Sequence, residues 1–91
     1  MQLRWTEEAA NDLERIADYL RRHAPDRAPN LIRRVYDAPS TLLTLPDRGR
    51  PGKKDGTREL VLTPLPYLVV YTVRDEVVFV VRILHGAQQW P

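Results

Sequence analysis

The feature that most constrains this chain is a change in the spacing of its apolar residues near the middle of the sequence. Up to residue 45 they recur every three or four positions, which is typical of amphipathic helices. The charged residues of the first helix, among them Asp12 and Arg15, mostly occupy the opposite side. After a loop rich in Gly, Pro and Lys, the spacing becomes two and β-branched residues dominate, as in strands. With 91 residues, the chain is long enough for one domain, 1–91, and too short for two.

The first half predicts a short strand followed by two helices. Residues 2–5 form the strand, and Thr6 is placed to cap a helix that ends before Pro25. Asp26 is the expected cap of the second helix. Pro39 should kink or break that helix, because proline lacks the amide for the backward hydrogen bond. The connection between the helices is short, so they should form an antiparallel hairpin.

The second half predicts three consecutive strands. They span residues 57–63, 67–74 and 77–85, and the connections between them are short enough for antiparallel hairpins. The last run is apolar on both faces, so it should be a central strand. The predicted fold class is α+β: an N-terminal strand, a helical hairpin, and a three-stranded antiparallel meander that completes one sheet. The hairpin should cover one face of this sheet and leave the other open.

The turn between the last two strands determines their predicted register. If Asp75 and Glu76 form a two-residue turn, one face carries three cross-strand pairs and His85 points to the other face. These pairs are Tyr71 with Val80, Val69 with Arg82, and Tyr67 with Leu84. The open face of the sheet would then gather arginine and aromatic side chains that could hold a macromolecular partner.

Positive charge is concentrated in the loop before the strands. The chain carries 14 Lys and Arg against 12 Asp and Glu, a net charge of +2. From Arg48 to Arg58, five basic residues accompany a single acid, Asp55, a local charge of +4. The five are Arg48, Arg50, Lys53, Lys54 and Arg58. Such a cluster attracts phosphate groups or an acidic protein segment, although a solvated loop can have the same composition.

Several kinds of catalytic site lack the residues they need. The chain has no cysteine, which excludes disulfides, thiolate ligands and cysteine nucleophiles and fits a cytoplasmic location. It has only two histidines and no glycine-rich phosphate loop, so no metal site and no cofactor are expected. The longest uncharged run, 60–73, contains two prolines and is too short to cross a bilayer, so no membrane partner is expected.

The residue types that remain could cleave RNA without a metal. That reaction needs a base for the 2′-hydroxyl, cations for the charge on the phosphorane and an acid for the leaving oxygen. The candidate catalytic residues are Arg58, Arg82 and His85, surrounded by Lys53, Lys54, Tyr67 and Tyr71. Structural roles are the alternative. Arg82 could pair with Glu59, His85 could cap a strand end, and the tyrosines could pack in the core.

Five segments cover nearly the whole chain in order: LRWTEEAANDLERIADYL, LLTLPDRGRPG, TREL, PYLVVYTV and VVRILHGAQQWP. Together they resemble the RelE/ParE superfamily of type II toxin–antitoxin toxins, and the closing Leu-His-Gly stretch is most similar to the ParE-like branch. The resemblance implies the α/β toxin fold, a co-expressed antitoxin that masks the toxin, and control of bacterial growth or plasmid maintenance.

The superfamily implies two alternative activities. RelE-like members are ribosome-dependent mRNA endonucleases, whereas ParE-like members bind DNA gyrase and block replication. Arg58 and Arg82 match arginines of the nuclease branch, as Lys53 and Lys54 match its basic loop. The C-terminal tyrosine of that branch has no counterpart in HGAQQWP, so the acid step would fall to His85. The resemblance therefore favours a gyrase-binding toxin that is not an enzyme. The alternative is a metal-independent endoribonuclease that acts on mRNA at the ribosome.

A toxin of either branch needs a surface for its antitoxin, with which it forms a hetero-oligomer. The antitoxin is expected to fold a disordered C-terminal segment onto the toxin, covering apolar surface and pairing acids with arginines. The predicted partner-binding residues are Arg48, Arg50, Lys53, Lys54, Arg58, Tyr67, Tyr71 and Arg82.

Overall fold

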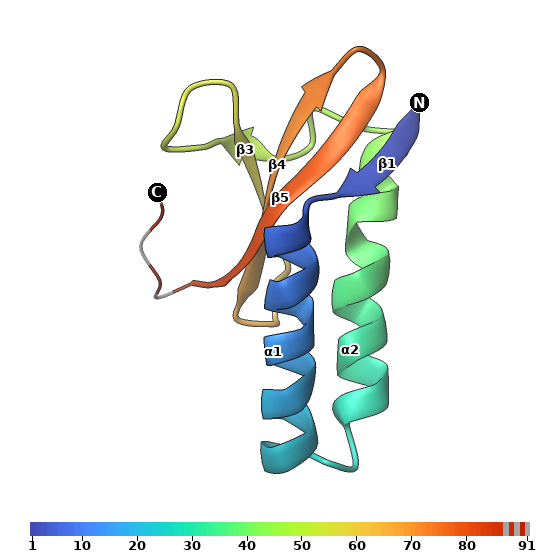
Figure 1. The fold of residues 1–91 in the computed structure, drawn as a ribbon, viewed down its shortest axis with the longest axis vertical. Coiled ribbons are helices and arrows are strands. Elements are labelled where there is room, and N and C mark those ends of the chain that lie inside the picture. The colour runs from blue at the N-terminus through green and yellow to red at the C-terminus, as the bar shows by residue number, and fades with distance from the viewer. Residues whose placement is uncertain (87, 89, 91) are drawn as a thin grey trace.

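The computed structural model describes residues 1–86, 88 and 90, arranged as Figure 1 shows. Its first half consists of β1 (Gln2–Trp5), α1 (Glu7–His23), α2 (Ala28–Asp37) and the 3₁₀ helix η1 (Ala38–Leu43). Its second half consists of β2 (Arg50–Pro51), β3 (Arg58–Val61), β4 (Tyr67–Arg74) and β5 (Val77–His85). Three residues at the end of the predicted domain lie outside the described residues: Ala87, Gln89 and Pro91.

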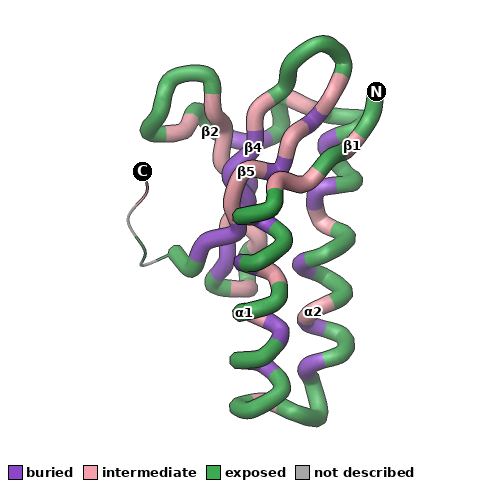
Figure 2. Tube along the Cα trace, viewed as in Figure 1, coloured by how far each residue is buried: buried purple, intermediate pink, exposed green. Residues whose placement is uncertain are grey.

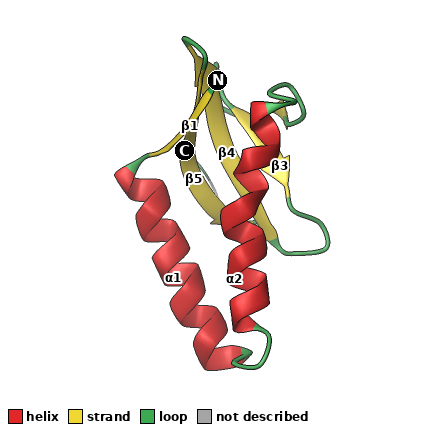
Figure 3. Cartoon of the chain, turned by 90° about the vertical axis from the view of Figure 1, so that its right-hand side faces the viewer, coloured by secondary structure: helices red, strands yellow, loops and turns green. Residues whose placement is uncertain are grey.

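The strands form one sheet in the order β1-β5-β4-β3-β2. β5 lies between β1, to which it is parallel, and β4, to which it is antiparallel, so its predicted central position is confirmed. α1 and α2 form an antiparallel hairpin that covers one face of the sheet (Figure 3). The α+β class is therefore confirmed. The short strand β2 was not predicted, because two residues are too few to show a periodic pattern.

α1 begins at the predicted cap. The Oγ1 of Thr6 accepts a hydrogen bond from the N–H of Ala9 at 3.1 Å and donates one to the carbonyl of Val81 at 2.9 Å. One hydroxyl therefore stops the fraying of the helix start and joins it to β5.

Thr6→Ala should lower the free energy of unfolding by about 1–2 kcal/mol, because an N-cap is lost and a strand carbonyl loses its donor. Thr6→Ser keeps the hydroxyl and serves as the matched control. Urea denaturation of the two variants measures the difference. Equal midpoints for Thr6→Ala and the wild-type chain would show that the cap does not stabilise this fold.

The second helix confirms one prediction and corrects another. α2 ends two residues before Pro39 and the chain continues as η1, which confirms the predicted break. The predicted cap Asp26 is wrong, because Arg27 precedes the helix and no side chain caps it. The N–H of Ala28 instead donates to the carbonyl of Ala24 at 2.8 Å, so the tight turn itself satisfies this amide.

The main core lies between the helical hairpin and the sheet, where Figure 2 shows buried segments of both. It contains Ala9, Val35, Leu42, Leu60, Tyr67, Val69, Tyr71, Val78, Val80 and Ile83. The tip of the hairpin projects beyond the sheet (Figure 1) and has a small cluster of its own, formed by Leu20, Ala28 and Leu31. Neither α1 nor α2, the α-helices of the described residues, has the length and apolarity that crossing a membrane requires.

The turn between β4 and β5 forms as predicted, but the register farther from it differs. Asp75 and Glu76 have φ angles of 52° and 65°, as a two-residue hairpin turn requires, and Tyr71 pairs with Val80 as expected. The register then shifts, because Val81 is an extra residue in β5. The pairs beyond the shift are Val70 with Arg82, Val69 with Ile83, Leu68 with Leu84, and Tyr67 with His85.

This bulge changes which residues share a face. Val69 and Tyr71 point into the core under the helices, so Val70 and its partner Arg82 lie on the opposite face. His85 shares a face with Tyr67. The predicted grouping of Arg82 with Tyr67 and Tyr71 on the open face is therefore wrong, and the two aromatic rings belong to the core.

Candidate functional site

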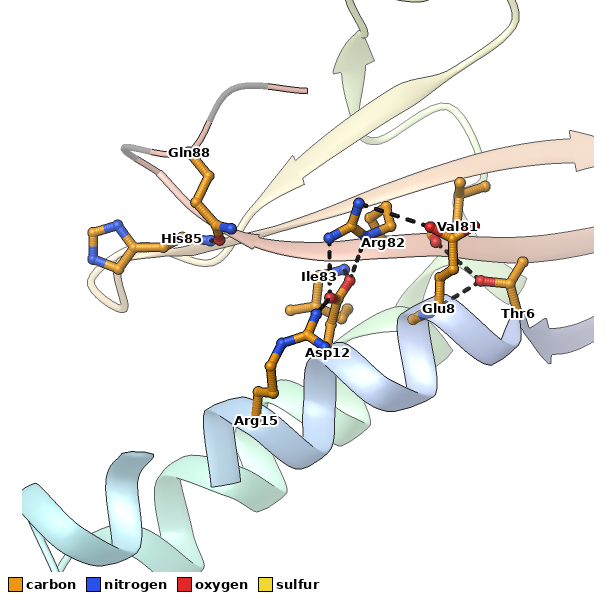
Figure 4. Close-up of polar contacts among 10 residues, drawn as sticks. Thr6, Glu8, Asp12, Arg15, Val81, Arg82, Ile83, His85 and Gln88 are labelled. Carbon is orange, nitrogen blue, oxygen red and sulfur yellow. Dashed lines mark hydrogen bonds and ion pairs between the residues drawn. The ribbon is translucent and has the colours of Figure 1, made fainter. Parts of the chain in front are cut away.

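The ion pair between Arg82 and Asp12 is the central feature of the candidate site. Asp12, on α1, is 3% exposed. Arg82 of β5 donates to it twice, from Nε to Oδ2 at 2.7 Å and from a terminal nitrogen, Nη2, to Oδ1 at 3.1 Å (Figure 4). This parallel pair of bonds is the strong arrangement for a guanidinium and a carboxylate. The hydrogen bond to Asp12 raises the pKa of Arg82.

Three other groups complete the surroundings of this pair. The backbone N–H of Ile83 donates to Oδ2 of Asp12 at 2.9 Å, and Arg15 donates to its Oδ1. Glu8, one turn before Asp12, lies 3.9 Å from Nη1 of Arg82. Both carboxylate oxygens of Asp12 therefore have two donors each, which explains how a carboxylate can be buried here.

Sequence reasoning missed Asp12 and assigned the wrong partner to Arg82. Glu59, the expected partner, instead pairs with Arg50, whose Nη2 lies 3.0 Å from its Oε1. A signal was present in the sequence. Asp12 follows the buried Ala9 by three positions and precedes Ile16 by four, so it lies on the apolar side of α1 and not with the exposed charges.

Side chains also close the edge of β5 that β1 leaves open. β1 pairs only with Val77–Val80, the first four residues of β5. Farther along, three outward backbone groups each bind a side chain (Figure 4). They are the carbonyl of Val81 with Thr6, the N–H of Ile83 with Asp12, and the N–H of His85 with Oε1 of Gln88. Another strand could add there only by displacing these contacts.

Arg58 and Tyr71 hold the loop that follows η1. Tyr71 is fully buried; its hydroxyl donates to the carbonyl of Pro46 at 2.6 Å and accepts from the N–H of Gly49 at 2.9 Å. Nη1 of Arg58 donates to the carbonyls of Gly49 at 2.7 Å and Asp47 at 3.3 Å. A Cβ on Gly49 would lie 2.7 Å from the Tyr71 ring, so the loop and the ring fit together only with glycine.

Tyr67, the first residue of β4, pairs with His85, the last residue of β5. Their rings are edge to face, with centroids 6.0 Å apart, and they line a pocket of about 350 Å³ with Tyr19 and Arg15. Burial, and then the nearby Tyr19, raise the pKa of Tyr67, so its hydroxyl holds its proton. Neither Arg58 nor Arg82 lines this pocket.

The structure does not bring the three candidate catalytic residues together on one face. Arg58 pairs with Tyr71 and Arg82 with Val70, which places the two arginines on opposite faces of the sheet. His85 shares the face of Arg58. It pairs with Tyr67, at the end of the β4–β5 pair that is remote from the turn at Asp75 and Glu76.

The basic loop is exposed around β2 and the segment before β3. Its four exposed cations are Arg48, Arg50, Lys53 and Lys54. Nζ of Lys54 lies 6.0 Å from the ring centroid of Trp90, a cation–π distance. Among the described residues, no three His, Asp or Glu side chains gather as metal ligands.

Residues 3–90 match the model of the family described as the ParE toxin of the type II toxin–antitoxin system parDE. The chain belongs to the ParE toxin family. Y4kP of Sinorhizobium fredii is 37% identical to it over 90 residues, which is 99% of this chain and 93% of the relative. Toxin RelE2 of Caulobacter vibrioides is 39% identical over 87 residues, which is 96% of this chain and 97% of the relative.

A solved structure has the same fold. The matching chain belongs to the chromosomal ParDE toxin–antitoxin system from P. aeruginosa, with a TM-score of 0.86 and 27% identity. The match covers 93% of this chain and 95% of the other. The predicted membership of the RelE/ParE superfamily is confirmed, and the chain is a ParE-family toxin of a type II toxin–antitoxin system.

Proposed function

We propose that this toxin binds DNA gyrase and stops bacterial growth without cleaving RNA, and that a cognate antitoxin neutralises it. The observation that carries the proposal is the position of Arg82. Its guanidinium is bound at two points to the buried Asp12, whereas a catalytic arginine must face the scissile phosphate. Moving it to a substrate would leave Asp12 buried without its partner, which costs about 3–5 kcal/mol.

The other residues proposed for a nuclease site also make contacts within the fold. Arg58 binds the carbonyls of the loop after η1, on the opposite face of the sheet from Arg82. The raised pKa of Tyr67 makes it a weak substitute for the missing C-terminal tyrosine. Membership of the ParE family supports the same conclusion.

The basic loop is the proposed contact surface for the partners of the toxin. Of the predicted partner-binding residues, four are exposed and carry this proposal: Arg48, Arg50, Lys53 and Lys54. Acidic groups on the surface of gyrase or on the antitoxin would meet them. Arg58 and Tyr71 hold the loop after η1, whereas Tyr67 packs in the core and Arg82 binds Asp12 on α1.

The alternative is a RelE-like endonuclease that cuts mRNA at the ribosome. One observation favours it: the relative named Toxin RelE2 is 39% identical over nearly its whole length. In this activity the exposed His85, beside Tyr67 at the pocket, would donate the proton to the leaving oxygen.

Induction of the chain in bacteria should arrest growth, and co-expression of its antitoxin should restore it. In the arrested cells we expect plasmid DNA to lose negative supercoils or to be broken, and mRNA to stay intact. The double charge reversal Lys53→Glu and Lys54→Glu should weaken the arrest, because it removes the cationic contacts. Arg22→Glu, an exposed charge reversal at the end of α1, is the control.

Arrested cells with normal supercoiling and cuts in mRNA at fixed codon positions would contradict the gyrase proposal and support the endonuclease. Growth that continues while the chain accumulates in folded form would contradict both activities.

A further inference from the structure

A groove of about 770 Å³ runs between α1 and α2. All of its lining residues belong to the two helices or to their connection, so it opens away from the sheet, on the side of the hairpin that Figure 3 shows in front. A smaller hollow of about 440 Å³ continues it, and the two share Leu13, Arg21 and Ile32. We call this continuous surface the hairpin groove. No element of the described chain covers it.

The hairpin groove is apolar along its length. Leu13 and Ile32 are half-buried in its middle, and the small, buried Ala17 leaves a hollow beside them. Tyr36, 55% exposed, lies toward the sheet, and the exposed Pro29 lies toward the tip of the hairpin. Exposed apolar surface with charged residues around it is typical of an interaction site.

The two ends of the hairpin groove carry charges of opposite sign. Near the tip, the side chain of Arg21 is 63% exposed and only approaches Asp18, at 3.4 Å. Toward the sheet, Glu14 of α1 and Asp37 of α2 line the groove, and neither makes an ion pair with a described residue. The groove is therefore basic at one end and acidic at the other.

This pattern is complementary to itself about a two-fold axis. On α1, Arg21 and Glu14 are seven positions apart, about two helical turns, so they lie on one face at equal distances from the middle of the groove. On α2, Pro29 and Tyr36 have the same spacing. When a second hairpin lies antiparallel on the first, each member of a pair meets the other member on the second copy.

We propose that the hairpin groove is the interface of a symmetric homodimer of this chain. Arg21 of each copy binds Glu14 of the other, and the ring of Tyr36 packs on Pro29 of the other. The Ile32 side chains of the two copies meet near the axis. Because both copies use the same surface, association stops at the dimer. Residues 48–58 do not line the groove, so the dimer carries two exposed basic loops. The inference goes beyond the proposed function and does not depend on the target of the toxin.

The size of the hairpin face indicates how strong the dimer is. α1 has 17 residues and is therefore about 25 Å long, and a face two helices wide measures about 20 Å across. Each copy buries about 500 Å², less than the roughly 800 Å² per partner of a typical stable interface. We therefore expect a dissociation constant in the micromolar range and a monomer at low concentration.

Sedimentation velocity of the purified chain, from about 1 μM to about 500 μM, should show a monomer that becomes a dimer. Arg21→Glu and Glu14→Arg should each weaken the dimer by about tenfold or more, because like charges then meet twice across the axis. The exchange variant that combines both changes restores opposite charges and should dimerise within about threefold of the wild-type chain. Arg22→Glu reverses a neighbouring exposed charge outside the lining and is the control.

A chain that stays monomeric over the whole range would overturn the inference. So would a dimer that both single variants leave unchanged, since another surface would then hold it. A dimer that both single changes weaken and the exchange variant does not restore would overturn the pairing of Arg21 with Glu14 and with it the symmetric arrangement. A monomeric chain whose Arg21→Glu variant binds the antitoxin more weakly would assign the groove to a helix of the antitoxin and contradict the homodimer.

Discussion

Asp12→Ala should lower the free energy of unfolding by about 3–5 kcal/mol, because it removes the buried counter-ion of Arg82 and leaves only the exposed Glu8 nearby. The guanidinium of Arg82, 20% exposed, would lose both of its short hydrogen bonds, and the N–H of Ile83 would lose its acceptor. Arg82→Ala should have a similar effect, since it removes two of the four donors to a carboxylate that is 3% exposed. Chemical denaturation followed by circular dichroism measures both losses.

Two controls separate the unpaired charge from simple loss of contacts. Arg15 also donates to Asp12, but its own side chain is 67% exposed. Arg15→Ala should therefore change the free energy of unfolding by about 1 kcal/mol or less. The double variant Asp12→Leu with Arg82→Met removes both charges, and should recover most of the stability lost by either alanine variant. An Asp12→Ala variant as stable as the Arg15→Ala variant would show that the buried pair does not hold α1 to β5.

Tyr71→Phe should lower the free energy of unfolding by about 2–4 kcal/mol, although it removes a single oxygen. The hydroxyl binds both the carbonyl of Pro46 and the N–H of Gly49, and the tyrosine is fully buried. Each backbone group that is left without a partner in a buried position costs about 1–3 kcal/mol. The loop after η1 should also exchange its amides faster.

Gly49→Ala should destabilise the same contact from the other side, by about 1–3 kcal/mol. Its Cβ would lie 2.7 Å from the Tyr71 ring and hydroxyl and 3.0 Å from the carbonyl of Glu59. Because the two variants disturb one contact, the double variant should lose less stability than the sum of the single losses. Strictly additive losses in the denaturation experiment would contradict a direct contact between this glycine and the tyrosine.

The parts of the fold that the sequence predicted correctly depend on interactions between near neighbours. The Thr6 cap binds an amide three residues away, and Pro39 interrupts the helix in which it stands. The turn at Asp75 and Glu76 joins two strands that follow each other directly. Patterns of this kind are visible in a short window of sequence, and the bounds of α1, β4 and β5 follow from them.

The features that could not be predicted join distant parts of the chain. The bulge at Val81 lies in a strand that is apolar on both faces, so an extra residue leaves the hydrophobic pattern unchanged. The partner of Arg82 is 70 positions away, on α1. An arginine in an apolar strand did indicate an internal partner. To identify Asp12 and not Glu59 as the partner of Arg82, one must know which face of α1 contacts β5.

These distant contacts decide how the candidate site is interpreted. The bulge separates Arg82 from the tyrosines, and two hydrogen bonds join its guanidinium to Asp12. The exposed basic loop, by contrast, could be predicted from charge alone, because short segments with so little opposing charge remain in solvent.

The most direct test uses the purified chain with DNA gyrase and supercoiled plasmid, and in parallel with translating ribosomes. We expect the chain to inhibit supercoiling or to trap cleaved DNA on gyrase, and to leave the mRNA on the ribosomes uncut. Codon-positioned cuts in that mRNA, abolished by His85→Ala and accompanied by normal gyrase activity, would contradict a toxin whose Arg82 serves the fold and whose target is gyrase.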